Sequence, residues 1–276
     1  MICRDNIELM SPVIKKRIEV ALTQAPHEFS ILFQPIWWLH SLKRPWGFEV
    51  LTRWSSPFNI GPSVFIPIIE TEPILRRQLT LLITKLVVQE IRLFILREPQ
   101  ITYFTMNVSF NDLNEGEYVN ELGKIITEHP YVVNRLFLEV TETSKIVMTD
   151  TFMKSLETLK ELGVRVGLDD LGAGYADQDA LMLPIWSMVK TDRSHVHNIG
   201  NVYESTHSLI KLLETCLSFT SYVVIEGIEL AKQHLALQRT VNKNVMVQGY
   251  YYARPMASNV ILEKYFNSKN ATLAIL

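Results

Sequence analysis

Eight short apolar segments recur along the chain and predict eight β-strands. They are rich in Val, Ile, Phe, Tyr and Trp, the residues that strands favour. Stretches that look helical separate most of them, for example residues 74–95, 150–162 and 205–219. Alternating strands and helices predict parallel strands, and eight such strands favour a closed barrel. The predicted strands cover residues 31–39, 46–54, 103–110, 135–140, 164–170, 187–192, 222–228 and 245–253.

The connection between the first two predicted strands is too short for a parallel crossover. Only the segment HSLKRPW separates the apolar sequences FQPIWWL and GFEVLTRW. A parallel crossover needs about a dozen residues or more, whereas a hairpin needs only a few. We therefore predict an α/β fold, a TIM-like (β/α)8 barrel whose first strand is antiparallel. Periodicity alone leaves an open doubly wound sheet as the alternative.

Length and the absence of linkers favour one compact domain. The 276 residues suit a single α/β barrel, and the chain has no internal repeat and no Pro- or Gly-rich linker. We predict an N-terminal helical extension over residues 1–28, a barrel domain over residues 29–268 and a C-terminal tail over residues 269–276. Within the extension, Ser11 is the expected N-cap of a helix and Pro12 its first residue.

Composition argues against several classes of protein. Hydrophobic residues make up 47% of the chain, and the net charge of −2 gives no strong field that would attract DNA or a lipid surface. Cys3 and Cys216 form neither a disulfide framework nor a zinc pattern, so a reducing, cytoplasmic location is expected. The first residues are too charged for a signal peptide. Lys85, Glu90 and Arg92 interrupt the longest apolar stretch, so no membrane span is expected.

Polar residues interrupt the predicted strands, mostly in their C-terminal halves. In α/β barrels this is the end at which catalytic residues gather. Any one of these residues alone is more simply explained by an ion pair or a solvated strand end. Their recurrence in most of the strands is what favours a shared site. They are Glu49, Asn107, Glu139, Asp169, Asp170, Lys190, Glu226 and Gln248.

The five carboxylates of this set predict a metal centre. Two like charges 4 Å apart repel by about 4 kcal/mol at an effective dielectric constant of ~20, and Lys190 alone cannot neutralise five of them. Either their pKa values rise or cations lie among them. Carboxylate and amide oxygens suit Mg²⁺, Mn²⁺ or Ca²⁺, and two such ions are suited to cleaving a phosphodiester. His195 and His197 have no third zinc-type ligand nearby, and we assign them to a surface loop.

Adjacent aspartates raise a geometric problem, because neighbouring side chains of a strand point to opposite faces. Asp169 and Asp170 stand side by side in the sequence VGLDDLGAGY. We expect Asp169 to face the barrel axis, and Asp170 to lean in from the start of the following loop. The glycines of that loop would permit the required backbone angles.

Eight motifs in order carry a resemblance to a known family: FQPI, GFEVLTRW, NVS, LFLEVTE, GLDDLGAGY, VKTDRSHV, VVIEGIE and QGYYYARP. From about Phe29 to about Phe266 the chain resembles the EAL domain, the bacterial phosphodiesterase that opens cyclic di-GMP to linear pGpG. The resemblance implies a barrel with a reversed first strand. The chain shows no GGDEF cyclase motif and no sensor segment, so it is similar to a stand-alone member.

The resemblance also implies roles in catalysis and metal binding. Two ions, Mg²⁺ or Mn²⁺, are expected, and Ca²⁺ is expected to inhibit. Lys190 would orient the attacking water, Glu226 would act as a ligand or as its base, and Glu49 would complete the catalytic set. Asp170 would hold the second ion. The implied metal ligands are Glu49, Asn107, Glu139, Asp169, Asp170 and Glu226.

Further residues are implied to bind the substrate or support the site. Glu142 would hold the glycine-rich loop, and Glu229 would support Glu226. Read from the residues alone, Glu142 and Glu229 could equally be helix N-terminal carboxylates. The residues implied to contact cyclic di-GMP or fix the site around it are Gln34, Leu51, Arg53, Gln248 and Pro255.

Four positions depart from the family pattern. Val50 stands where Ala is usual, Leu171 where Phe is usual, and Ala173 and Leu230 where Thr is usual. The loss of the threonine hydroxyl at position 173 removes a possible loop anchor worth about 1 kcal/mol. These changes bear on rate and regulation more than on the fold or the metal centre.

Three functions follow as hypotheses. The first is a metal-dependent cyclic di-GMP phosphodiesterase that lowers the second messenger controlling biofilm and motility. The second is a non-catalytic module that binds cyclic di-GMP or a regulatory protein. The third, weaker hypothesis is a different metal-dependent barrel phosphodiesterase or lyase. A homodimer is the expectation from the family, a protein partner is open, and DNA binding is not expected.

Overall fold

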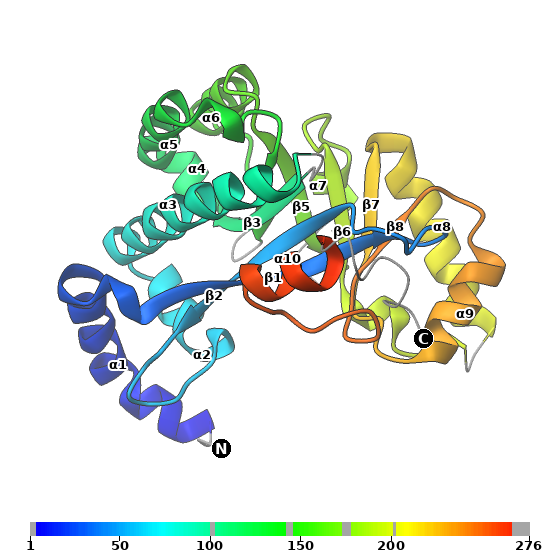
Figure 1. Ribbon diagram of the computed structural model, residues 1–276, viewed down its shortest axis with the longest axis horizontal. Helices are drawn as coiled ribbons and strands as arrows, with labels where there is room; N and C mark the ends of the chain where they lie inside the picture. The colour runs from blue at the N-terminus through cyan, green and yellow to red at the C-terminus, as the bar shows by residue number, and fades with distance from the viewer. Residues whose placement is uncertain (1–3, 100–102, 142–145, 173–177, 201–202, 267–276) are drawn as a thin grey trace.

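Eight strands form a closed barrel in which each strand lies beside its neighbours in the sequence (Figure 1). This computed structural model describes residues 4–99, 103–141, 146–172, 178–200 and 203–266. The closed order confirms the predicted barrel over the open sheet. The strands are β1 (Phe29–Trp38), β2 (Gly47–Trp54), β3 (Tyr103–Ser109), β4 (Leu136–Thr141), β5 (Arg165–Leu171), β6 (Met188–Thr191), β7 (Tyr222–Ile225) and β8 (Met246–Val247).

The first strand is reversed, as the short connection predicted. β1 pairs antiparallel with both β2 and β8, whereas all the other neighbouring pairs are parallel. The register places Gln34 of β1 opposite Glu49 of β2. Two residues that the sequence assigned to one site are therefore adjacent across the only hairpin among the barrel strands.

Helices cover the outside of the barrel, and α10 crosses in front of β1 (Figure 1). In the described part of the chain, the search for a helix long and apolar enough to cross a membrane finds none. The α-helices are α1 (Arg4–Gln24), α2 (Pro62–Glu70), α3 (Pro73–Arg97), α4 (Phe110–Glu115), α5 (Glu117–Glu128), α6 (Asp150–Glu161), α7 (Gln178–Leu181), α8 (Tyr203–Phe219), α9 (Ala231–Thr240) and α10 (Ser258–Phe266). Short 3-10 turns are η1 (Pro26–Glu28), η2 (Pro130–Val132) and η3 (Arg193–Val196).

Helix α1 begins earlier than the sequence predicted. It starts at Arg4 and includes Pro12 within the helix, so Ser11 is not its N-cap. Its buried residues are Ile14, Ile18 and Ala21, which share one face at helical spacing. Packing of this face against α2 and α3 stabilises the helix, whichever residue begins it. The capping signal at Ser11 is therefore overridden.

Strands β7 and β8 end sooner than predicted, because two glycines bring the chain close to other backbone. A Cβ at Gly227 would lie 2.3 Å from the Cβ of Arg193, and one at Gly249 would lie 2.0 Å from the carbonyl oxygen of Ile228. Gly227 also has φ +73°, which favours glycine. Glu226 and Gln248 consequently stand just past their strands, at the rim of the barrel.

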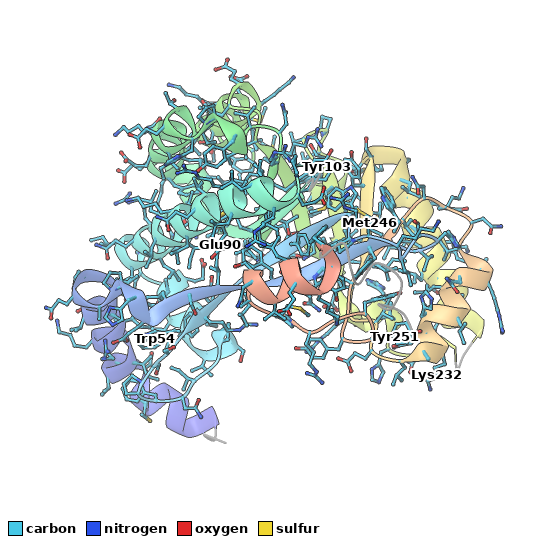
Figure 2. All side chains as sticks on the ribbon, in the orientation of Figure 1. Trp54, Glu90, Tyr103, Lys232, Met246 and Tyr251 are labelled. Carbon is cyan, nitrogen blue, oxygen red and sulfur yellow. The ribbon has the colours of Figure 1, made fainter. Side chains whose placement is uncertain are left out.

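An aromatic cluster fills the end of the barrel where the parallel strands begin. The Trp46 ring lies 4.6 Å from Tyr103, 5.2 Å from Tyr222 and 5.8 Å from Phe137, measured between ring centroids. Tyr103 and Met246 lie at this end, above Tyr251 in the view of Figure 2. Packed rings therefore fill the barrel interior at this end.

Replacing Trp46 by alanine should weaken the whole fold. Removing a buried aromatic ring usually costs about 3–5 kcal/mol of unfolding free energy, and here it would open a cavity among four rings. Urea unfolding followed by circular dichroism measures the loss. Leu93→Ala, which removes a side chain that is half exposed, is the matched control and should change little. Equal stability of Trp46→Ala and wild type would contradict the role of this cluster.

Candidate active site

The C-terminal ends of the strands bring the predicted polar residues to one mouth. Six of them lie within strands β2 to β6, one in each strand except β5, which carries two: Glu49, Asn107, Glu139, Asp169, Asp170 and Lys190. The register places Asn107 directly beside Glu139. Glu226 and Gln248 complete the ring from the ends of β7 and β8. Barrel closure therefore assembles residues that are far apart in the sequence.

Lys190 lies at the centre of this group. The residue is 1% exposed, and among its partners Glu139 is fully buried. One ammonium thus faces four carboxylates, and the cluster carries a net charge of −3 when all of them are ionised. The Lys190 Nζ lies 2.5 Å from Glu226 Oε1, 3.1 Å from Glu139 Oε2, 3.4 Å from Glu49 Oε2 and 3.6 Å from Asp169 Oδ1.

Two side-chain amides hold the Glu49 carboxylate in place. Gln248 Nε2 donates to Glu49 Oε2 over 2.7 Å, and Asn107 Nδ2 donates to Glu49 Oε1 over 3.3 Å. Both oxygens of Glu49 therefore have a donor, and the carboxylate cannot rotate without losing one of these bonds. This is the kind of neighbouring contact that fixes the orientation of a metal ligand.

The neighbouring aspartates reach the same site, as expected from the sequence. Asp170 adopts φ +53°, and the pairing of β5 with β6 shifts register between Leu168 and Leu171. This irregularity breaks the alternation that would send Asp170 to the opposite face. Carboxylate oxygens of Asp169, Asp170 and Glu226 consequently lie within 4.8 Å of one another.

Burial raises the pKa values of the clustered carboxyl groups. Desolvation is the main cause for Asp169, whose pKa rises to about 6, and for Glu226, whose pKa rises to about 8; the positive charge of Lys190 opposes both shifts. The pKa values of Glu139 and Asp170 rise for the same reason. For Lys190, burial favours the neutral amine, but the surrounding carboxylates outweigh it and raise the pKa well above the usual range.

The donor set fits a hard divalent cation. Glu139 Oε1 and Asp169 Oδ1 are buried and accept no hydrogen bond in the described part of the chain. A buried carboxylate oxygen without a donor is costly, and a cation would satisfy it. Carboxylate and amide oxygens are also the ligands that Mg²⁺ and Mn²⁺ prefer.

Two cavities open beside the cluster. The larger, of about 360 Å³, is lined by Asn107, Asp169 and Asp170, together with Leu51 and Arg53. The smaller, of about 180 Å³, is lined by predicted site residues that include Gln34, Glu49, Glu226, Glu229 and Gln248. Most of the residues assigned to substrate binding from the sequence therefore face one of these cavities.

Two of the substrate residues have other local contacts. Gln34 Nε2 donates to the carbonyl of Ala253 over 3.1 Å, which ties β1 to the loop after β8. Arg53 Nη1 donates to the carbonyl of Thr52 over 2.8 Å, and its half-exposed guanidinium faces the larger cavity. Pro255 lies outside the residues that line the two cavities. It precedes Met256, whose backbone pairs with Phe33.

Of the two glutamates predicted to support the site, the structure describes only Glu229. Glu229 is exposed and lines the smaller cavity, but no hydrogen bond or ion pair joins its side chain to Glu226 in the part of the chain that the structure describes. Glu142 and the altered loop position Ala173 lie outside the described residues.

The paired histidines are not both on the surface as predicted. His195 is half-buried, and its Nε2 lies 3.2 Å from the Leu171 carbonyl oxygen, beside Gly172. Only His197 is exposed. The strand-to-loop turn at Leu171 packs on His195, a long-range contact that no local pattern signals.

Among the lining residues that sequence reasoning missed, three have charged or aromatic side chains. Arg193 and Tyr250 border the smaller cavity, and Glu70 borders the larger. Arg193 and Tyr250 fall inside the motifs VKTDRSHV and QGYYYARP, so their positions close to Lys190 and Gln248 were the available signal. Glu70 ends a helix of the chain with no such neighbour, and only the fold brings it to the site.

Comparison with known proteins places the chain in a family. The profile of the EAL domain family matches residues 16–255, so the chain belongs to this family. The cyclic di-GMP phosphodiesterase RocR of Pseudomonas aeruginosa is 27% identical over 220 residues, which cover 79% of this chain and 55% of RocR. The probable cyclic di-GMP phosphodiesterase PdeG of Escherichia coli is 28% identical over 212 residues, 76% of this chain and 41% of PdeG.

Solved structures share the fold. The EAL enzyme Bd1971, solved with cAMP and cyclic di-GMP bound, superposes with a TM-score of 0.82 at 24% identity and covers 94% of this chain and 69% of Bd1971. The chain spans about half the length of the two curated relatives named above. The likeness to RocR and PdeG therefore concerns one region of each of those proteins.

The buried carboxyl groups predict how the metal-free protein responds to pH. A carboxyl whose pKa is higher in the folded chain than its unfolded value of about 4 binds more protons when folded. Stability is then full below the unfolded value and falls as the pH rises toward the folded values of about 6 for Asp169 and about 8 for Glu226.

In EDTA, we expect the unfolding free energy to fall by roughly 1–3 kcal/mol between about pH 5.5 and pH 8. Urea titrations at the two pH values measure this change. Glu226→Gln, which cannot ionise, should flatten the slope, whereas Glu121→Gln, at a side chain that is 47% exposed, should not. A metal-free protein that is more stable at the higher pH would contradict the electrostatic description of the cluster.

Proposed function

We propose that the chain hydrolyses cyclic di-GMP to linear pGpG in a metal-dependent reaction. The observation that carries this proposal is the buried group of four carboxylates around Lys190 at the open end of the barrel. The curated relative RocR is named a cyclic di-GMP phosphodiesterase, and PdeG a probable one. Cyclic di-GMP carries two phosphodiester anions, so its approach to such an acidic mouth needs cations, which the same carboxylates would hold.

Two ions, Mg²⁺ or Mn²⁺, are proposed. Bound there, they would supply Lewis acidity toward the scissile phosphodiester. Asp170 is proposed to hold the second ion, since one of its carboxylate oxygens lies within 4.8 Å of oxygens of Asp169 and Glu226. Ca²⁺, which tolerates looser coordination, is expected to bind and inhibit. The proposed ligands are Glu49, Asn107, Glu139, Asp169, Asp170 and Glu226.

Lys190 and Glu226 are proposed to handle the attacking water. Glu226 combines a 2.5 Å contact with Lys190 and a position on the cavity wall, so it can reach both the lysine and a water. Its carboxylate would accept the proton of the water as a general base. Lys190 would orient that water while keeping the carboxylates apart. Glu49, held by Gln248 and Asn107, would keep its geometry throughout.

Substrate binding is proposed for residues on the two cavity walls. Arg53 presents a guanidinium that suits a phosphate oxygen, and Leu51 offers an apolar surface beside it. Gln34 and Gln248 border the smaller cavity together. Pro255 would contribute through its backbone, since its loop is fixed to β1 by the Phe33–Met256 pairing.

The second candidate is a module that binds cyclic di-GMP without turnover. The altered turn after the metal aspartates favours it: Leu171 is buried at the end of β5, and Gly172 is held against His195. A turn fixed in this way could keep Asp170 from adjusting to a second ion. Such a protein would bind the nucleotide and leave it intact, so product analysis separates the two candidates.

Replacing Glu49 by alanine should abolish turnover without unfolding the chain. The change removes one proposed ligand and leaves the side-chain amides of Gln248 and Asn107 without their acceptor. We expect the rate of pGpG formation to fall by at least about 100-fold, measured by chromatography of the nucleotides. Glu121→Ala, at an exposed carboxylate far from the cluster, is the control. Full activity in Glu49→Ala would refute the assignment of this residue.

Divalent cations should stabilise the chain through the same carboxylates. Because Mg²⁺ or Mn²⁺ would neutralise the repulsion at the mouth, we expect the melting temperature to rise on metal addition, and more at pH 8 than at pH 5.5. Differential scanning calorimetry in EDTA and in Mn²⁺ gives the shift. Asp169→Asn should reduce it, and Asp150→Asn on the outer helix α6 should not. An unchanged melting temperature in millimolar Mn²⁺ would count against a metal centre.

A further inference from the structure

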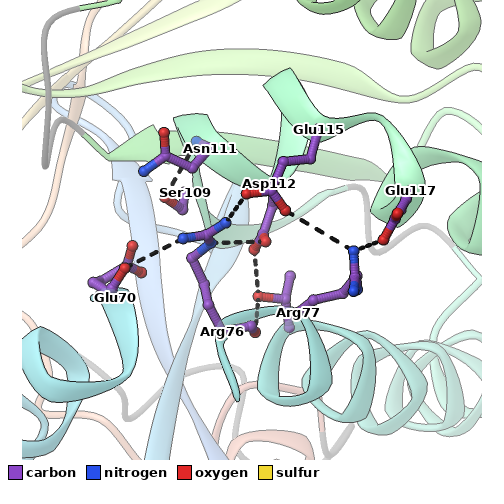
Figure 3. A network of polar contacts seen from close by, with 9 residues as sticks. Glu70, Arg76, Arg77, Ser109, Asn111, Asp112, Glu115 and Glu117 are labelled. Carbon is purple, nitrogen blue, oxygen red and sulfur yellow. Dashed lines mark hydrogen bonds and ion pairs between the residues drawn. The ribbon is translucent and has the colours of Figure 1, made fainter. Parts of the chain in front are cut away.

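A ring of polar contacts around one arginine lies beside the larger cavity (Figure 3). Its centre is Arg76, in the first turn of α3, which is 3% exposed. Arg76 Nε donates to Asp112 Oδ1 over 2.9 Å, and Nη1 donates to the carbonyl of Glu70 over 3.2 Å. Its Nη2 donates to Glu115 Oε1 over 2.5 Å. One guanidinium thereby joins the end of α2 to helix α4.

Asp112 is held from two sides. The residue is fully buried, and its second oxygen, Oδ2, accepts a hydrogen bond of 2.8 Å from the hydroxyl of Thr80. Both carboxylate oxygens therefore have a donor from α3. Helix α4 cannot shift along α3 without breaking one of these bonds.

Helix α4 is joined to β3 at Ser109, the last residue of β3. The Ser109 hydroxyl oxygen accepts from the backbone N–H of Asn111 and caps α4. The path of contacts therefore runs from Glu70 to Arg76, on to Asp112, and along α4 to Ser109. It connects the last residue of α2 with the last residue of β3.

Both of those residues form walls of the proposed substrate cavity. Glu70 and Ser109 line the space of about 360 Å³ together with Asn107 and Arg53. Ser109 is two residues beyond Asn107 on the same strand. The ring therefore sets the separation between the α2 wall and the strand that carries a proposed metal ligand.

The location of Arg76 is unfavourable for stability alone. A cation in the first turn of a helix opposes the helix dipole, and buried ion pairs can often be replaced by apolar residues without loss of stability. What an apolar pair cannot supply is the directed bond to the Glu70 carbonyl. The advantage of Arg76 therefore lies in the geometry of the cavity wall.

We propose that Arg76 is a positioning residue for nucleotide binding, which holds the α2 wall of the cavity against β3 through Glu70 and Ser109. The inference rests on the proposed function, because it concerns the substrate of that same site. It predicts a change in KM for cyclic di-GMP and little change in kcat, since the ring touches the cavity wall and not the Lys190 cluster.

The test compares steady-state kinetics of the full chain with cyclic di-GMP and Mn²⁺. The double variant Arg76→Met/Asp112→Leu removes both buried charges together and so avoids leaving one unpaired. Ser109→Ala removes the cap that ties α4 to β3 without removing a charge, and keeps the test available if the double variant does not fold. Arg77→Met is the matched control, because the neighbouring Arg77 pairs with Glu117 on the solvent side of the same network.

We expect KM to rise about tenfold in the double variant and less in Ser109→Ala, with kcat within about threefold of wild type and Arg77→Met unchanged. Folding is checked by circular dichroism. A folded double variant, or a folded Ser109→Ala, with the wild-type KM would overturn the inference, as would a fall in kcat at constant KM. A wild-type chain that neither hydrolyses nor binds cyclic di-GMP would instead defeat the proposed function, and this inference with it.

Discussion

Burying four carboxylates around a single ammonium is the interaction on which the rest of the structure depends. The Lys190 cluster keeps a net negative charge at ordinary pH unless its carboxyl groups take up protons or cations bind. Burial favours both protonation and cation binding. A chain can keep such a group only if the remaining fold is rigid enough to resist its repulsion. The closed barrel provides that rigidity, because each strand is fixed by neighbours on both sides.

One end of the barrel contributes mainly to stability, and the other end carries the candidate site. At one end, Trp46 and its neighbouring rings fill the interior and supply favourable burial. At the other end, strands β7 and β8 end early, Gly227 and Gly249 carry no side chain, and polar groups occupy the space. Binding residues therefore stand on strand ends and short loops whose positions the apolar end fixes. The ring around Arg76 extends this support to the wall formed by α2.

Patterns along the sequence predicted the parts that repeat. Apolar segments gave the strands, and the short HSLKRPW connection gave the reversed β1, because loop length limits the direction of the next strand. The polar residues within those segments gave the cluster, since a barrel brings equivalent ends of its strands together. The early ends of β7 and β8 were not predictable, because close approach at Gly227 is a contact with Arg193 and leaves no local mark. The Arg76–Asp112 pair joins residues on different helices, and single-sequence reasoning has no means of pairing them.

The proposed hydrolysis of cyclic di-GMP depends on divalent cations held by the Lys190 cluster. Anion-exchange chromatography of cyclic di-GMP after incubation with the purified chain in Mn²⁺, beside the same mixture in EDTA, tests this dependence. We expect pGpG to appear in Mn²⁺ and not in EDTA. Intact cyclic di-GMP in both mixtures, from a chain shown to be folded, would contradict it and favour a module that binds without turnover.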